Sequence, residues 1–135
     1  MSNPILLCTC LVYFTNAGTC LLFKQYTYSY AFMFLVFTSL LFHSNSIIMY
    51  NAIDKLAIFT IVYLGSNKYM NIINTQTIIE NPAGYLLPPI TFFCSFYLFG
   101  YGYITNQYCF DSVYGNRYHA YLHLLSSIGH HCLLL

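Results

Sequence analysis

Residues 30–43 read YAFMFLVFTSLLFH, a run of large apolar side chains that contains no charged residue. Alone it is short for a helix that must cross roughly 30 Å of bilayer hydrocarbon. Tyr26, Tyr28 and Tyr30 lengthen it, because tyrosine rings favour the headgroup level while the hydroxyl stays in water. The stretch therefore predicts a membrane-spanning helix over 26–43 with a tyrosine belt at its start.

The composition of the whole chain also indicates a membrane protein. Only seven of the 135 residues are charged, four of them basic and three acidic, whereas 59% are hydrophobic. A soluble domain carries about a quarter charged residues, so most of this surface must face lipid or other helices. The net charge of +1 supplies no basic stripe and argues against nucleic acid as a partner. The six cysteines are interpreted as small membrane-buried residues rather than as disulfides or zinc ligands.

Four further apolar segments flank this helix and are joined by polar links, the longest of them at 68–84. Pro88 and Pro89 stand near the start of the fourth segment, where a missing N–H costs least. We expect an all-α, multi-span transmembrane helical bundle that forms a single domain over 1–135. Its spans, about five in number, are predicted at 5–23, 26–43, 53–65, 85–104 and 118–135.

The ionisable residues in or beside the spans are the informative ones, because each is costly there unless it is paired or bound to a metal. His43 ends the second span, Asp54 opens the third, and His119 and His123 open the last. Residues four apart share a helix face, so Ser39 lies beside His43, and His119 lies beside His123. A His-x-x-x-His pair is the spacing by which one helix offers two imidazoles to a single metal ion.

A shared site requires His43, Asp54 and His119 on one side of the membrane, and five spans place them there. Three histidines with an open fourth position for water form a catalytic zinc pattern, and zinc-activated water suits amide or ester hydrolysis. Asp54 is expected to accept the proton of that water or to fix an imidazole tautomer. Ser39 is expected to donate a hydrogen bond to the developing oxyanion.

Each of these residues also has a structural explanation. A single histidine at a span end is often interfacial, and a serine in a membrane helix often bonds to the carbonyl four residues earlier. Asp54 suits a helix N-terminus or a pairing with Lys55. His130 and His131 are interpreted as interfacial, about 16 Å along the last helix from His119 at 1.5 Å per residue.

Two windows of the chain resemble a known family. Ser39-Leu-Leu-Phe-His43, followed after eleven residues by Asp54, and the window YHAYLHLL at 118–125 are similar to the alkaline ceramidases. These belong to the CREST superfamily of membrane hydrolases, with hemolysin III proteins and the progestin and adipoQ receptors. The resemblance implies a seven-helix bundle with Zn2+ held by His43, His119 and His123, and with Ser39 and Asp54 beside the metal-bound water. It further implies hydrolysis of the ceramide amide and a location in the endoplasmic reticulum or Golgi.

The span count leaves a second function open, because this chain has one credible span between its third and last spans where the resembled family has three. The first hypothesis is a zinc-dependent integral membrane hydrolase that cleaves an amide bond of a ceramide-like lipid. The second is an inactive, shortened relative that acts as a structural or receptor-like membrane protein. A third reading is a fragment or a spurious reading frame.

Overall fold

The computed structural model describes residues 4–45, 47–104 and 113–134, and within these ranges the chain is helical apart from short connections. No strand occurs in the described ranges. The helices are α1 (Pro4–Cys10), α2 (Tyr13–Leu22), α3 (Tyr26–Ser44), α4 (Ile48–Thr75), α5 (Pro82–Ile104) and α6 (Val113–Cys132).

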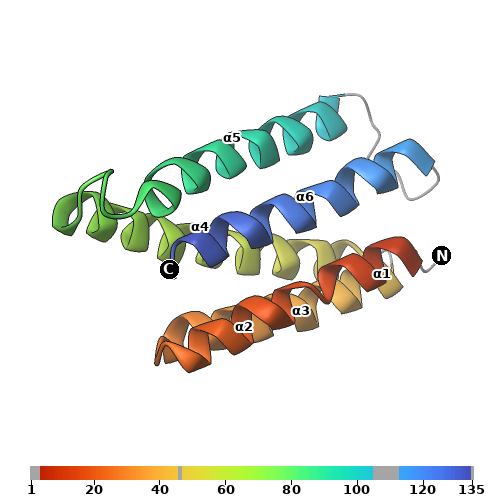
Figure 1. Cartoon of the computed structure of the whole chain (residues 1–135). Coiled ribbons are helices and arrows are strands. Elements are labelled where there is room, and N and C mark those ends of the chain that lie inside the picture. The colour runs from red at the N-terminus through yellow and green to blue at the C-terminus, as the bar shows by residue number, and fades with distance from the viewer. Residues whose placement is uncertain (1–3, 46, 105–112, 135) are drawn as a thin grey trace.

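The helices form a bundle of five antiparallel passes, because α1 and α2 follow one another in a single pass (Figure 1). α3 packs against α2 and α4, while α6 packs against α5, α1 and α2. The end of α3 and the starts of α4 and α6 lie at the same end of the bundle (Figure 1). The all-α bundle and the five passes predicted from the sequence are therefore confirmed.

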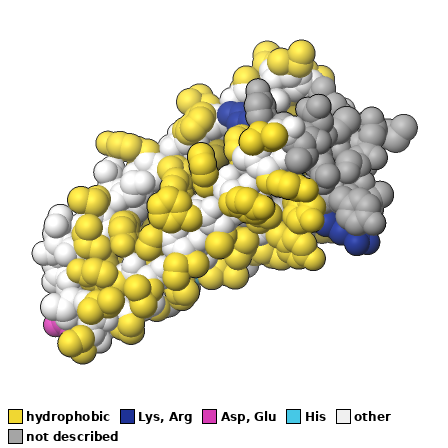
Figure 2. Space-filling view, turned by 90° about the horizontal axis from the view of Figure 1, so that it is seen from above, with side chains coloured by type: hydrophobic (Ala, Val, Ile, Leu, Met, Phe, Trp, Pro, Cys, Tyr) yellow, Lys and Arg dark blue, Asp and Glu magenta, His cyan; other side chains and the backbone are white. Residues whose placement is uncertain are grey.

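Among the residues that the structure describes, three helical stretches are long and apolar enough to cross a membrane. They are Pro4–Leu22, with 19 residues, Ile48–Thr75, with 28, and Pro82–Gly102, with 21. Hydrophobic side chains spread along the face seen in Figure 2, and few charged side chains interrupt them. Soluble monomeric proteins rarely expose an apolar surface of this extent. The chain is thus a membrane protein, with most of its outer surface suited to lipid.

The core lies where α3 meets α2 and α4. Phe32 of α3 is fully buried and packs against the rings of Tyr13, at 6.0 Å between centroids, and Tyr28, at 5.0 Å. Small residues of the neighbouring helices let these rings fit, among them Ala17 of α2 and Ala57 of α4. Of the cysteines predicted to be buried, Cys10, Cys20 and Cys132 are buried, whereas Cys8 and Cys94 face outward. Cys109 lies outside the described residues.

The third pass is much longer than the predicted span 53–65, since α4 runs from Ile48 to Thr75. The polar residues at 68–84 were interpreted as a loop, and for 68–75 this was wrong. Ser66 and Thr75 donate their hydroxyl protons to carbonyls four residues earlier, at 2.8 Å each, so the helix satisfies them internally. Only 76–81 connects α4 to α5.

The other predicted boundaries shift by smaller amounts. The fourth pass begins at Pro82 rather than at 85, and the last begins at Val113 rather than at 118 and ends at Cys132. The link predicted between the spans 85–104 and 118–135 falls partly on residues 105–112, outside the described ranges, and its remainder is helical. Sequence polarity marks a membrane surface rather than the end of a helix, which explains these differences.

The first pass is interrupted between α1 and α2 by a tightened turn. Val12 N–H donates to the Thr9 carbonyl at 3.2 Å and Phe14 N–H to the Leu11 carbonyl at 3.0 Å, both with the three-residue spacing of a 3₁₀ turn. Before this turn, Thr9 of α1 contacts His123; after it, Thr15 and Asn16 of α2 contact His131 and Ser127.

Candidate metal centre

Three histidines predicted to share a site do meet inside the bundle. His43 lies in the last turn of α3, and His119 and His123 lie on successive turns of α6. One ring nitrogen from each can be chosen so that all three lie within 4.8 Å of one another. The ring centroids are 4.9 Å apart for His43 and His119, 5.3 Å for His43 and His123, and 4.7 Å for His119 and His123.

Three histidine nitrogens are suitable zinc ligands, and their separation is somewhat larger than a bound zinc ion requires. Three imidazoles with room for a fourth ligand are a common catalytic zinc set. Zinc–nitrogen bonds of about 2.0–2.1 Å hold tetrahedral donors roughly 3.3 Å apart, so the rings must close by a further ~1.5 Å from their 4.8 Å separation. Rotation of the imidazoles about their side-chain bonds is the movement that would bring them closer. His43 is 1% exposed and His123 4%, whereas His119 is half-buried, so the centre is open to its surroundings only on the His119 side.

Thr9 of α1 supports His123 from a segment that the sequence gave no reason to consider. Its Oγ1 lies 3.0 Å from His123 Nδ1 and 3.0 Å from the Ile5 carbonyl. When the hydroxyl proton goes to the carbonyl, Nδ1–H donates to Thr9 and leaves Nε2 for a metal. The ring of Tyr13 also packs edge-on against His123 at 5.7 Å. The orientation of this imidazole is therefore fixed from two sides.

Asp54 is buried at 3% exposure and is held by two hydroxyls of α3. Ser39 donates to Asp54 Oδ1 at 2.6 Å, and Thr38 donates to the same oxygen at 3.1 Å. Ser39 precedes His43 by one helical turn, so the carboxylate is attached to the side of α3 that carries the metal-ligand candidate. Asp54 does not belong to the group of side chains whose donor atoms converge for a metal.

These contacts bear on the structural explanations of Ser39 and Asp54. The Ser39 hydroxyl goes to the Asp54 carboxylate rather than to its own helix, so the expected local bond is not the one that forms. A pairing with Lys55 was one of two structural explanations of Asp54, and the Lys55 ammonium lies 4.9 Å from the centre of the Phe99 ring, over its face. Sequence reasoning missed Thr38, because a threonine in an apolar helix gives no signal of the side chain it will face.

Below the three histidines, the same face of α6 makes further polar contacts. Ser126 Oγ lies 2.5 Å from Tyr13 Oη, and Ser127 donates to Asn16 Oδ1 at 2.6 Å. Asn16 Nδ2 returns a hydrogen bond to the Ser127 carbonyl at 3.0 Å. These bonds tie α6 to α2, and they fix the rotation at which His119 and His123 face His43.

His130, which was interpreted as interfacial, makes contacts within the bundle. Its ring packs edge-on against Tyr28 at 5.7 Å and against Phe32 at 5.2 Å, and its Nδ1 is hydrogen-bonded to the Tyr28 hydroxyl. Tyr28 is 3% exposed, so it leaves the predicted tyrosine belt, whereas Tyr26 and Tyr30 remain exposed. His131 is half-buried, and its Nε2 lies 3.0 Å from the hydroxyl of Thr15.

Comparisons with protein-family models, with curated proteins and with solved structures return no match for this chain. The resemblance to the alkaline ceramidases thus rests on the two sequence windows. What the described residues add is geometric: the two windows lie against each other, and three imidazoles from them converge.

Proposed function

We propose that this chain is a zinc-dependent membrane hydrolase that cleaves an amide bond of a ceramide-like lipid taken from the bilayer. The observation that carries the proposal is the convergence of His43, His119 and His123, from helices at opposite ends of the sequence, within 4.8 Å. Ionisable residues inside a membrane bundle are expensive and are by default functional. Three of them gathered at one point indicate a common ligand rather than three separate packing roles.

The residues around the histidines suit amide hydrolysis. A zinc ion held there would polarise the lipid carbonyl and lower the pKa of a bound water to about 7. Asp54 is the proton acceptor, because its Oδ1 is occupied by the Ser39 and Thr38 hydroxyls while Oδ2 receives no hydrogen bond from the described residues. The proton that it takes can later be passed to the leaving amine.

The proposal gives Ser39 a different role from the one first expected. Because the Ser39 hydroxyl donates its hydrogen bond to Asp54 at 2.6 Å, Ser39 orients the carboxylate and does not face an oxyanion. The same contact also supports the second hypothesis, an inactive relative. In that case the two hydroxyls would hold Asp54 in place, and a metal with no open position for water would only join the helices. Only a measurement of turnover separates the two.

Metal content and turnover of the purified protein test the proposal together. We expect one zinc per chain and hydrolysis of a fluorescent short-chain ceramide, and we expect the zinc to be lost in His119→Ala. Asp54→Asn should keep the zinc and lose about 10²–10⁴-fold in turnover, the usual contribution of a general base. The control is Tyr121→Ala on the same helix, at an exposed side chain, which should change neither quantity.

Two results would contradict the proposal in different ways. One zinc per chain in the triple alanine variant of His43, His119 and His123 would show that the metal lies elsewhere. Zinc that is lost as expected, without any turnover of amide or ester lipids in the unmodified chain, would assign the histidines to the structural role.

A further inference from the structure

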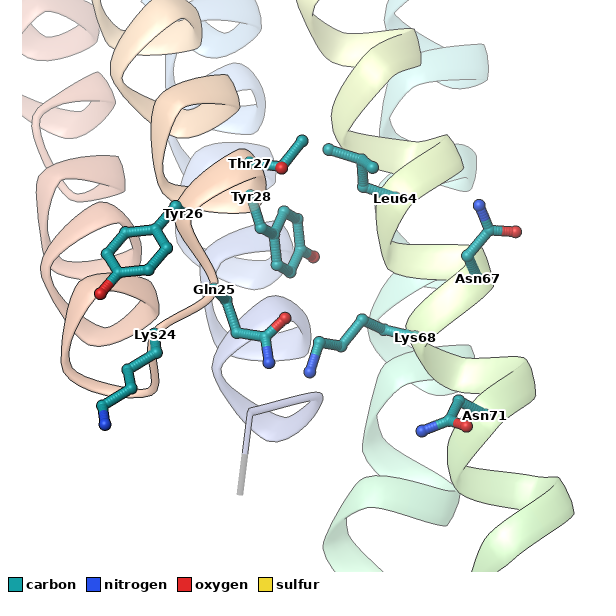
Figure 3. Close-up of a pocket in the computed structure, with 9 residues that line it drawn as sticks. All are labelled: Lys24, Gln25, Tyr26, Thr27, Tyr28, Leu64, Asn67, Lys68 and Asn71. Atoms are coloured by element: carbon teal, nitrogen blue, oxygen red, sulfur yellow. The ribbon is translucent and has the colours of Figure 1, made fainter.

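A cavity of about 510 Å³ lies at the opposite end of the bundle from the three histidines, between the start of α3 and the second half of α4. Figure 3 shows its lining. Two lysines and three amide side chains supply most of its polar atoms: Lys24, Gln25, Asn67, Lys68 and Asn71. A volume of a few hundred Å³ is that of a small-ligand site.

The cavity holds half of the basic side chains of the whole chain, which has four Lys and Arg residues. The two described carboxylates have other partners. Asp54 is bound by hydroxyls of α3. Glu80 accepts hydrogen bonds from the backbone N–H of Thr77 at 2.7 Å and from its hydroxyl at 2.9 Å, and these bonds lower the pKa of Glu80. The positive charge in the cavity is therefore left for an external anion.

The polar groups are arranged around one side of the cavity. In Figure 3 the half-buried Lys68 extends from α4 toward Gln25, while Lys24 stands at the outer edge and points away from the centre. Lys24 is placed there by the turn that ends α2, in which Gln25 N–H donates to the Cys20 carbonyl at 2.8 Å and Lys24 N–H to the Leu21 carbonyl at 3.0 Å. This is the Schellman pattern. Lys68 is thus the inner contact and Lys24 the outer one.

The position along the bundle identifies the source of the anion. The exposed rings of Tyr26 and Tyr30 mark the headgroup level at this end, and Leu64 gives the cavity an apolar side. A lipid phosphate at that depth would reach Lys68 while its acyl chains continue along α3 and α4. α3 also begins here without a side-chain cap, so its first N–H groups face the same region.

We propose that this cavity binds the phosphate group of an anionic membrane phospholipid. The site is separate from the histidine centre and does not depend on the hydrolase proposal. A zwitterionic lipid fits less well, because its ammonium group would meet the same two lysines. The chemical class recognised is a phosphate with net negative charge, carried by a lipid such as phosphatidylglycerol.

Native mass spectrometry of the detergent-purified protein tests the proposal, with phosphatidylglycerol and phosphatidylcholine offered at equal concentrations. We expect one retained phosphatidylglycerol per chain and little phosphatidylcholine. Lys68→Gln should weaken the binding about five-fold, the usual effect of one lysine near an anionic headgroup. The matched control Lys55→Gln removes the same charge at the other end of the bundle and should leave binding unchanged. Thermal unfolding of each variant verifies that it is folded.

An excess of inorganic phosphate distinguishes lipid from soluble anion. Retention of the lipid supports the proposal, whereas displacement of the lipid together with phosphate binding that Lys68→Gln abolishes assigns the cavity to free phosphate and overturns the lipid part. Equal retention of both lipids, or equal binding by Lys68→Gln and the unmodified chain, overturns the site as a whole.

Discussion

Replacing Asn16 by alanine removes a buried amide that joins α2 to α6 by two hydrogen bonds, to Ser127 Oγ at 2.6 Å and to the Ser127 carbonyl at 3.0 Å. Hydrogen bonds between membrane helices contribute about 0.6 kcal/mol each on average and at most about 1.7. The two bonds together thus amount to roughly 1–3 kcal/mol, and Asn16 is completely buried, so no water replaces them. We expect Asn16→Ala to lower the free energy of unfolding by about that amount.

The assay is reversible unfolding in mixed detergent micelles, with a double-mutant cycle on Ser127→Ala. The serine substitution removes only the bond to Asn16 Oδ1, so the coupling energy of the cycle measures that single contact and should be about 0.6 kcal/mol. Thr19→Ala is the matched control, because the Thr19 hydroxyl donates only to the carbonyl of Thr15 in its own helix. If Asn16→Ala behaves like this control, or if the two substitutions are additive, the assigned role of the pair is refuted.

Three further predictions concern helix packing, a helix end and the carboxylate of the candidate site. Gly129→Ala would place a Cβ 2.1 Å from Thr91 Oγ1, so it should separate α5 from α6 at a cost of about 1–3 kcal/mol in the same unfolding assay. Gly100→Ala is the control and should not destabilise the fold, because nothing lies within 4 Å of a Cβ at Gly100. Lys24 has φ 57°, so Lys24→Gly should stabilise the chain by about 1 kcal/mol in a thermal melt; a lower melting temperature would contradict the turn geometry. Ser39→Ala should keep zinc and reduce kcat. The acidic limb of the pH–rate profile should shift to higher pH, because the Asp54 carboxylate loses a hydrogen-bond donor, and an unchanged profile would show that Ser39 does not act on Asp54.

The number of passes and the meeting of the histidines could be predicted because both depend on local features. A scarcity of charge marks the membrane, and the spacing of His119 and His123 marks one helix face. The end of α4 could not be predicted in this way, because its amide residues are polar yet continue the helix beyond Gly65. Polarity predicts which side chains meet water, and it does not predict where the backbone stops being helical.

The partners of the histidines were less predictable than the histidines themselves. Thr9 and His123 are 114 residues apart, and Asn16 and Ser127 are 111 apart. A hydroxyl or an amide in an apolar helix signals that it needs a partner, but several helices offer one. Only α6 showed in its sequence which of its side chains face the other helices. Ser127 and His130 follow His123 in steps of four and three residues, so they lie on the helix face that carries His119 and His123.

That continuous face of α6 connects the candidate site with the stability of the bundle. Helices in lipid gain little from hydrophobic burial against one another, so polar contacts and close packing decide how each one is rotated. His123 meets Thr9 of α1, Ser127 meets Asn16 of α2, and His130 is hydrogen-bonded to Tyr28 of α3. A rotation of α6 that broke one contact would break the others and would also turn its two candidate ligands away from His43. Under the metal-site proposal, metal affinity and the packing of α6 would be thermodynamically linked: a bound ion would stabilise the bundle, and a substitution that loosens α6 would weaken the binding of the ion.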